Sequence, residues 1–355
     1  EKIPQAGALD DPMLGFGVVN LPNNFDFNEE DMTAKEVSVS QKFPFPGKRG
    51  LGEEAAAKEA DAGAAEADDV ANQVAKDVKI TFYDLSHVYR TMEVTQRNKG
   101  LLEELARITQ TRYSLGQAIQ EDVIRNQVEI SKMVDDLIML DQKRRALTAR
   151  LNYLLNRPPN DPLGRPAEVG FRPAAFSIED LQQQAAANNP MLRALKQDIA
   201  ARGKSVDLAR RDYFPDFSLK FAYGQRDDRL DMVTGMVEMN LPIFYKSKQE
   251  RKVAEAYAEV RSSQAKFDGA QNEIFYMIAD MGSMAQRLER KIELYRTGII
   301  PQTRLQIDTA MSAYMVNKAD FMTLLDSRMR FYRYELDYHG ALTEYEKSVA
   351  ALEAA

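Results

Sequence analysis

The sequence has no cysteine and no long apolar run, and proline and glycine are sparse at 14 and 18 of 355 residues. Without cysteine, neither a disulfide framework nor a thiolate metal site can form. No apolar stretch approaches the ~18 residues of a membrane-spanning helix, although strands of about 9–11 residues can span a bilayer in a closed barrel. Hydrophobic residues make up 44% and charged residues 28% of the chain. This composition favours long helices over compact α/β domains.

Several classes of function are disfavoured. The net charge of −7 argues against a nucleic-acid partner, because phosphate binding needs a basic face. No glycine-rich phosphate loop and no catalytic constellation of nucleophile, base and acid is recognisable. His87 and His339 each lack a second ligand at metal-binding spacing and are interpreted as structural. Met277, Met281 and Met284 share a helix face, where methionine usually fills a core. We therefore predict neither an enzyme nor a cofactor or metal protein.

Four short segments alternate between apolar and polar residues, as strands with one apolar face do. They cover residues 12–20, 36–43, 216–224 and 232–241. In the third segment, Phe217, Leu219 and Phe221 alternate with Ser218 and Lys220. These segments predict four amphipathic strands.

Longer regions repeat apolar residues every three or four positions, which is typical of helices with one buried stripe. Residues 51–156 and 246–352 are each predicted to form a helical hairpin, and residues 177–213 a shorter helical region. Ser177 is a predicted N-cap, and Asn189-Pro190 predicts a second helix start because proline is favoured at the first helical position. Residues 157–176 form a linker rich in proline and glycine.

The order strand, strand, helical hairpin occurs twice, which indicates an internal duplication. Tyr314, for example, follows Tyr113 by 201 residues. The first repeat covers residues 1–156 and the second covers residues 177–355. The second repeat opens with a helix that has no counterpart in the first. We therefore expect a further helix and a signal peptide upstream of the given sequence.

Four strands cannot close a barrel, and open sheet edges cannot lie in lipid. Apolar residues alternate with polar ones along these strands, so one face of the sheet needs an apolar environment. Association of chains meets both conditions, because three copies would supply twelve strands, an even number suited to an outer-membrane barrel. We therefore expect a homotrimer in contact with outer-membrane lipid.

Two segments carry a resemblance to a known family: TRYSLGQAIQEDV at residues 111–123 and SAYMVNKADFMTLLD at residues 312–326. QKFPFPGKRG and NLPIF, which follow the second and fourth strands, support it. The chain resembles the TolC family of outer-membrane channels in tripartite efflux systems. The resemblance implies a mainly helical trimer, in which a twelve-stranded β-barrel stands on an α-helical barrel that crosses the periplasm of a Gram-negative bacterium. DPMLGFGVVNLP and QKFPFPGKRG look most like the branch that serves heavy-metal exporters.

The resemblance makes the two segments the periplasmic tips of the hairpins, where a periplasmic adaptor docks. Gly116 would close the first tip at positive φ, and Asn317, the next most tolerant residue type, the second. The residues that match the docking positions are Arg112, Tyr113, Leu115 and Gly116 in the first tip and Tyr314, Val316, Asn317 and Lys318 in the second. A plain turn between helices, without a partner, is the alternative.

The resemblance also implies a periplasmic gate near the tips, where the family narrows its tube with acidic rings. Asp326 stands at a matching position, and three copies around one axis would attract cations. Thr323 occupies a second position that is acidic in the best-known member, and Ala319 replaces an arginine. The salt-bridge network of the family is therefore in doubt in this chain. An ordinary solvated helix residue is the alternative for Asp326.

The predicted function is an outer-membrane duct that works with a periplasmic adaptor and an inner-membrane pump of RND or similar type. Two alternatives stay open. A soluble periplasmic coiled-coil scaffold or adaptor would explain the hairpins but not the strands. A truncated family member without function would explain the missing leading helix.

Overall fold

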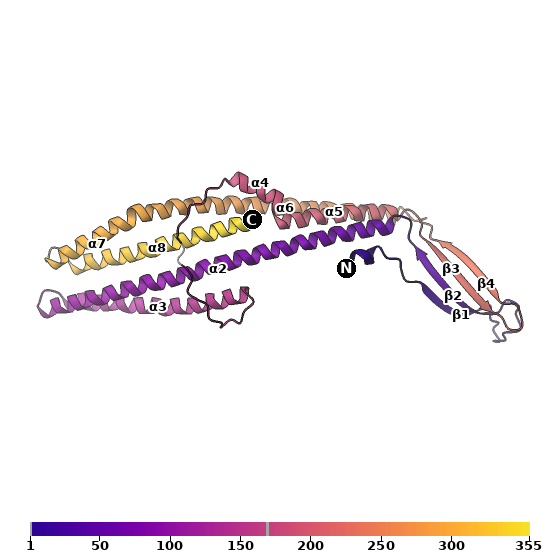
Figure 1. Ribbon diagram of the computed structural model, residues 1–355, viewed down its shortest axis with the longest axis horizontal. Coiled ribbons are helices and arrows are strands. Elements are labelled where there is room, and N and C mark those ends of the chain that lie inside the picture. The colour runs from indigo at the N-terminus through magenta and orange to yellow at the C-terminus, as the bar shows by residue number, and fades with distance from the viewer. Residues whose placement is uncertain (1, 168–169) are drawn as a thin grey trace. The chain divides into compact units, whose positions relative to one another are not determined.

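The computed structural model describes residues 2–167 and 170–355. The helices in this part of the chain are α1 (Lys2–Ala6), α2 (Lys48–Ser114), α3 (Gln120–Leu154), α4 (Ile178–Asn188), α5 (Pro190–Arg211), α6 (Gln249–Leu294), α7 (Ile300–Met315) and α8 (Phe321–Ala354) (Figure 1). The strands are β1 (Met13–Val19), β2 (Ala34–Phe43), β3 (Phe217–Gln225) and β4 (Met232–Met239). None of the described helices is both long enough and apolar enough to cross a membrane.

The chain divides into two compact units. One comprises Glu1–Asp69 and Asn188–Asn272, and the other comprises Val70–Ala187 and Glu273–Ala355. The first unit holds the sheet, and the second holds the tips of both hairpins. Each unit draws on both predicted sequence repeats, so the duplication does not coincide with the folding units.

The four predicted strands form one antiparallel sheet in the order β1-β2-β3-β4. Leu14, Val39 and Phe221 lie opposite one another across β1, β2 and β3. Ser38 and Ala222, one position along, pair on the other face. Because side chains alternate between faces, this register collects the apolar residues on one face and the small and polar ones on the other.

The helical stripes predicted from the sequence are buried in part, with Leu85, Ile130 and Leu324 inside but Val70 and Val74 exposed. A cluster in the second unit combines residues of α2, α3, α7 and α8, namely Val94, Leu102, Leu105, Ile130, Met133, Ala310, Tyr314, Phe321, Leu324, Leu325 and Tyr332. Each of these helices therefore turns one apolar face inward, which is how an amphipathic helix gains most of its stability.

Local signals place the helix starts of the second repeat. The N–H of Asp180 donates to Ser177 Oγ at 3.2 Å, and the N–H of Leu192 donates to Asn189 Oδ1 at 3.1 Å. Both caps confirm the sequence-based expectation. The linker between the repeats lies between α3 and α4, without helix or strand in its described part; Glu168 and Val169 lie outside the described residues.

Two features differ from the sequence-based expectation. The short helix α1 lies in a stretch where the sequence pattern predicted neither helix nor strand. The first arm of the second hairpin is not one continuous α-helix, because a π-helical turn at Tyr295–Ile299 separates α6 from α7. Pro301 follows directly at the start of α7. Proline lacks an N–H and its ring clashes with the carbonyl four residues earlier, so a wider turn accommodates it.

Candidate functional site

Both hairpin tips end their first helix in the same backbone geometry. The N–H groups of Gln117 and Lys318 each donate at 2.8 Å to the carbonyl five residues earlier. Gly116 has a φ of 71° and Asn317 a φ of 59°. A helix end with a residue at positive φ is a Schellman-type motif. The predicted left-handed conformation is therefore confirmed at both tips, and the matching positions are 201 residues apart (317 − 116 = 201).

The eight predicted docking residues fall into two groups. Six of them are exposed: Tyr113, Leu115, Gly116, Val316, Asn317 and Lys318. Arg112 and Tyr314 are buried, at 8% and 4% exposure. They contact each other, since the Arg112 guanidinium lies 4.5 Å from the centre of the Tyr314 ring and donates to the Tyr314 carbonyl. Of the eight predicted docking residues, the six of the first group thus contribute to the exposed surface of the tips.

The helices that leave the tips start close together. Burial raises the pKa of Asp122 in the first turn of α3, and the nearby carboxylates of Glu121 and Asp320 raise it further. Asp320 caps α8 by accepting the N–H of Thr323 at 2.7 Å. The first turns of α3 and α8 therefore bring acidic groups of both hairpins to one place.

The predicted gate residues lie on α8. Asp326 is partly exposed and forms an ion pair with Arg330 one turn further along the same helix. Thr323 is exposed, and its carbonyl accepts the hydroxyl of Ser327 at 2.7 Å. Asp326 thus has a counter-charge within its own helix, and its role as part of a gate stays a prediction.

The apolar face of the sheet is exposed. Phe16, Phe221 and Val233 expose 76%, 64% and 78% of their surface. On the other face, Lys220 and Glu36 form an ion pair at 3.1 Å. Contiguous exposed apolar area on a sheet marks a surface that contacts another protein or a lipid.

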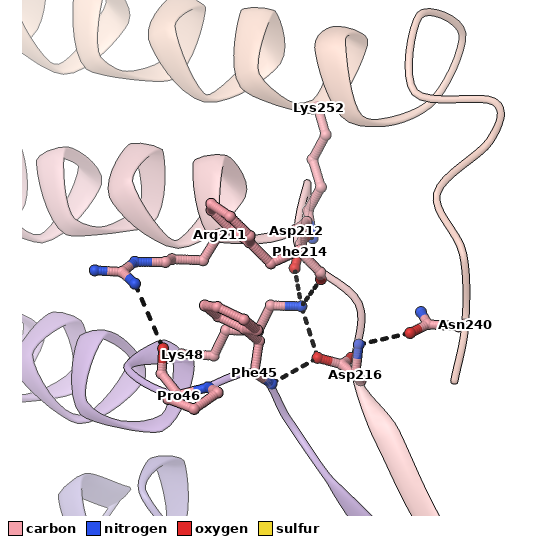
Figure 2. A network of polar contacts seen from close by, with 9 residues as sticks. All are labelled: Phe45, Pro46, Lys48, Arg211, Asp212, Phe214, Asp216, Asn240 and Lys252. Atoms are coloured by element: carbon pink, nitrogen blue, oxygen red, sulfur yellow. Dashed lines mark hydrogen bonds and ion pairs between the residues drawn. The ribbon is translucent and has the colours of Figure 1, made fainter. Parts of the chain in front are cut away.

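A compact polar network joins the sheet to the helices (Figure 2). Lys48, at the first turn of α2, places Nζ 2.8 Å from Asp216 and 3.1 Å from Asp212. Asp216 Oδ1 also accepts the N–H of Phe45 at 2.8 Å. The Phe45 and Phe214 rings stack with centroids 4.6 Å apart. These contacts tie the end of β2 to the start of β3, so the strands enter the sheet in a set direction.

The charges in this network stabilise one another. Burial opposes the charge of Lys48, but its bonds to Asp216 and Asp212 outweigh burial and raise its pKa. Burial likewise works against ionised Asp212 and Asp216, but the bonded lysines outweigh it and lower both pKa values. Asp212 has a second partner in Lys252, at 2.5 Å. The sequence did not predict this network, whose members Lys48 and Asp216 lie 168 positions apart.

The two histidines, interpreted from the sequence as structural, line the same cavity. This cavity of about 290 Å³ lies between α2, α8 and the linker, and its lining includes Arg90 and Arg165. His339 Nε2 accepts from Arg90 Nε at 3.2 Å. Burial, reinforced by the positive charge of Arg90, lowers the pKa of His339 to about 4. Burial, with nearby Lys143, also lowers the pKa of His87. Both histidines are thus held neutral near pH 7.

The chain is similar in sequence and in structure to known outer-membrane proteins. Residues 181–355 match the family described as "Outer membrane efflux protein". No curated protein matches the chain. Among solved structures, the outer membrane protein VceC of Vibrio cholerae superimposes with a TM-score of 0.82 at 17% identity, covering 99% of this chain and 89% of VceC.

Two further structures show the same similarity. CusC gives a TM-score of 0.82 at 15% identity, covering 99% of this chain and 84% of CusC. The open state of the MtrE outer membrane channel of Neisseria gonorrhoeae gives 0.79 at 16% identity, covering 99% of this chain and 81% of MtrE. The long hairpins and the small sheet thus define the fold of outer-membrane channel proteins. Residues 181–355, which include the second tip segment, thus match the outer membrane efflux protein family, in agreement with the resemblance predicted from the sequence.

Proposed function

We propose that three copies of this chain form the outer-membrane duct of a tripartite efflux system. The observation that carries the proposal is the sheet, which exposes an apolar face and leaves both edges open. Among the described residues, β1 and β4 each pair with one neighbour only. Unpaired backbone groups at the edges cannot lie in lipid, so β4 of one copy must pair with β1 of the next.

Threefold association satisfies both requirements of the sheet. Twelve antiparallel strands close into a barrel with no edge, and the apolar face then meets the hydrocarbon of the bilayer. The Lys220–Glu36 pair and the serines of β2 would face the lumen. The helices would continue from the barrel into the periplasm, where three copies of each hairpin complete a tube.

Transport through such a duct needs no chemistry in the chain. Among the described residues, no group of three or more His, Asp or Glu side chains could hold a metal ion. Energy and substrate choice would come from an inner-membrane pump, which a periplasmic adaptor connects to the exposed tip residues. The soluble-scaffold alternative is set aside, because the matched family is one of outer-membrane efflux proteins.

The segments around the first two strands support a heavy-metal exporter as the partner pump. Of the segments that resemble that branch, DPMLGFGVVNLP contains β1, and QKFPFPGKRG begins with the last three residues of β2. Deleting the gene would then lower the tolerance of the cell to a transition metal more than its tolerance to organic drugs. Equal loss for both classes of substrate would contradict the assignment to this branch.

Membrane fractionation combined with native mass spectrometry tests the duct. We expect the chain in the outer-membrane fraction, requiring detergent for extraction, with a mass of three chains. Reconstituted into a planar bilayer, the trimer should conduct ions. A folded monomer that stays in the aqueous phase would refute the proposal, because its apolar sheet face would then be covered within one chain.

A further inference from the structure

Arg112 ends the first hairpin's helix α2 but bonds to the second hairpin. Its Nη1 donates to the Tyr314 carbonyl at 2.9 Å, and its Nη2 donates to Asn317 Oδ1. Its guanidinium also lies over the Tyr314 ring, at 4.5 Å from the ring centre. One cation therefore engages three groups of the other tip, although the two residues that it bonds lie 202 and 205 positions away.

The bonded groups lie at the C-terminal end of α7, where a cation is favourable. The Tyr314 carbonyl is in the last turn of this helix, where carbonyls carry partial negative charge, and it also accepts the N–H of Asn317 at 3.2 Å. Asn317 is held at a φ of 59° directly after that helix. The Tyr314 ring also meets the Phe321 ring edge-on, with centroids 6.0 Å apart. Arg112 thus adds a charged contact from a different hairpin to the C-terminus of α7, which the N–H of Lys318 already caps.

The contacts of Arg112 with Tyr314 and Asn317, called the clamp from here on, come from the first tip. The position equivalent to Arg112 in the second tip is Ala313 (112 + 201 = 313), so no reciprocal arginine exists. The planar guanidinium can bond the carbonyl and the amide together while it stacks on the ring, and a lysine ammonium has no such fork. The two hairpins also pack through their shared apolar cluster, and Arg112 adds to it a polar link that comes from the first tip.

We propose that Arg112 is a positioning residue, which holds the second tip against the first so that a docking adaptor meets both as one surface. The inference rests on the proposed function. Leu115 and Val316 are the apolar side chains at equivalent positions of the two turns, and they expose 66% and 61% of their surface. Because the clamp already orders the two tips, binding of the adaptor costs less conformational entropy. The affinity of the adaptor for the tips is therefore higher.

Distances between the tips can be measured directly. The chain has no cysteine, so Gln117→Cys and Ser312→Cys introduce the only two spin-label sites, both at exposed positions. Labelled chains are mixed with an excess of unlabelled chains, so that double electron–electron resonance reports the distance within one copy. We expect a single narrow distance distribution, and a distribution at least about twofold broader in Arg112→Met and Arg112→Lys.

Variants of Asn317 separate the clamp from the turn. Asn317→Asp keeps an acceptor and should keep the narrow distribution, whereas Asn317→Gly keeps the positive φ but loses the acceptor and should broaden it. Arg107→Met removes an exposed arginine of the same helix and serves as the matched control. An unchanged distribution in Arg112→Met and in Asn317→Gly would overturn the clamp.

Docking is measured separately, with the periplasmic adaptor encoded beside this chain as the immobilised probe. We expect Arg112→Lys to weaken binding by about tenfold, and Arg107→Met to leave it unchanged. A broader distance distribution in Arg112→Lys together with unchanged adaptor binding would overturn the positioning role of Arg112. If the wild-type trimer does not bind the adaptor, the proposed function fails, while the distance measurement still decides whether the clamp exists.

Discussion

Lys48 shows how much can depend on one side chain where the sheet meets the helices. It is 10% exposed and neutralises two aspartates at once (Figure 2). We expect Lys48→Met to lower the free energy of unfolding by about 2–3 kcal/mol, because it leaves Asp216 and Asp212 partly buried without their shared cation. Urea titration of the detergent-solubilised protein measures this loss.

Lys252 provides the matched control for Lys48. It also binds Asp212, but its side chain is 58% exposed. Solvent screens an exposed ion pair, so we expect Lys252→Met to cost less than about 1 kcal/mol. Equal losses for the two variants would show that burial at Lys48 is not what makes its position important.

His339 predicts a dependence of stability on pH. Its pKa is lowered from 6.5 to about 4 in the folded chain, first by burial and then by Arg90. Above pH ~6.5 both states carry neutral histidine, so the group has no effect there. As pH falls below 6.5 the unfolded chain binds the proton first, and the folded state loses up to about 3 kcal/mol by pH ~4.

The test compares thermal unfolding midpoints at pH 7 and pH 5. We expect the wild type to lose stability on acidification, and His339→Gln to lose less, since glutamine can still accept from Arg90 but does not titrate. Because the pKa of His87 is lowered as well, His87→Gln should also reduce the dependence. An equal fall of the unfolding midpoint from pH 7 to pH 5 in the wild type and both variants would contradict this account of the cavity.

At the scale of elements, the sheet register makes a prediction that separates its two faces. Val39 and Ser38 are neighbours on β2 but point to opposite faces. On the lipid side of the proposed barrel, Val39→Arg should cost about 2–4 kcal/mol per chain near the bilayer centre, whereas Ser38→Arg on the lumen side should be tolerated. The yield of folded trimer in lipid vesicles measures the effect of each variant. Similar yields for Val39→Arg and Ser38→Arg would show that neither face of the sheet contacts lipid.

Elements also show where sequence patterns succeed. The period of two placed all four strands, and the period of three to four placed the hairpin helices, because each pattern reflects burial of one face of a regular backbone. Gly116 and Asn317 marked the tips because few residue types adopt positive φ. The π-helical turn was missed although Pro301 signals it, since the apolar stripe continues on both sides of the turn.

At the scale of the whole molecule, the predicted gate depends on symmetry. Three Asp326 carboxylates around one axis would attract cations, and cations bound between them would hold the pore narrow, although each carboxylate is paired with Arg330 in its own helix. We expect Asp326→Ala to increase ion leak through the isolated trimer and to weaken cation block in planar bilayers. Arg330→Ala should act in the opposite direction, by freeing the carboxylate. Unchanged conductance and block in both variants would remove Asp326 from the gate.

Association of several copies is a prediction that the chain supports for a physical reason. Four amphipathic strands are too few to close on themselves, so further copies are needed to complete a barrel. The single chain then shows the open edges and the apolar face that this argument needs. The division into two compact units was not predictable, because it depends on contacts between the two repeats.

Periodicity, turn residues and caps were enough to establish the fold class, the strand and helix positions and the two tips, because those properties depend on neighbours within a few residues. Packing alone decided which distant side chains meet. Arg112 reaches the Tyr314 carbonyl 202 positions away, Lys48 reaches Asp216 168 positions away, and His87 shares a cavity with His339. Such contacts arise only when separate elements dock, and a contact between two docked elements leaves no period in either one.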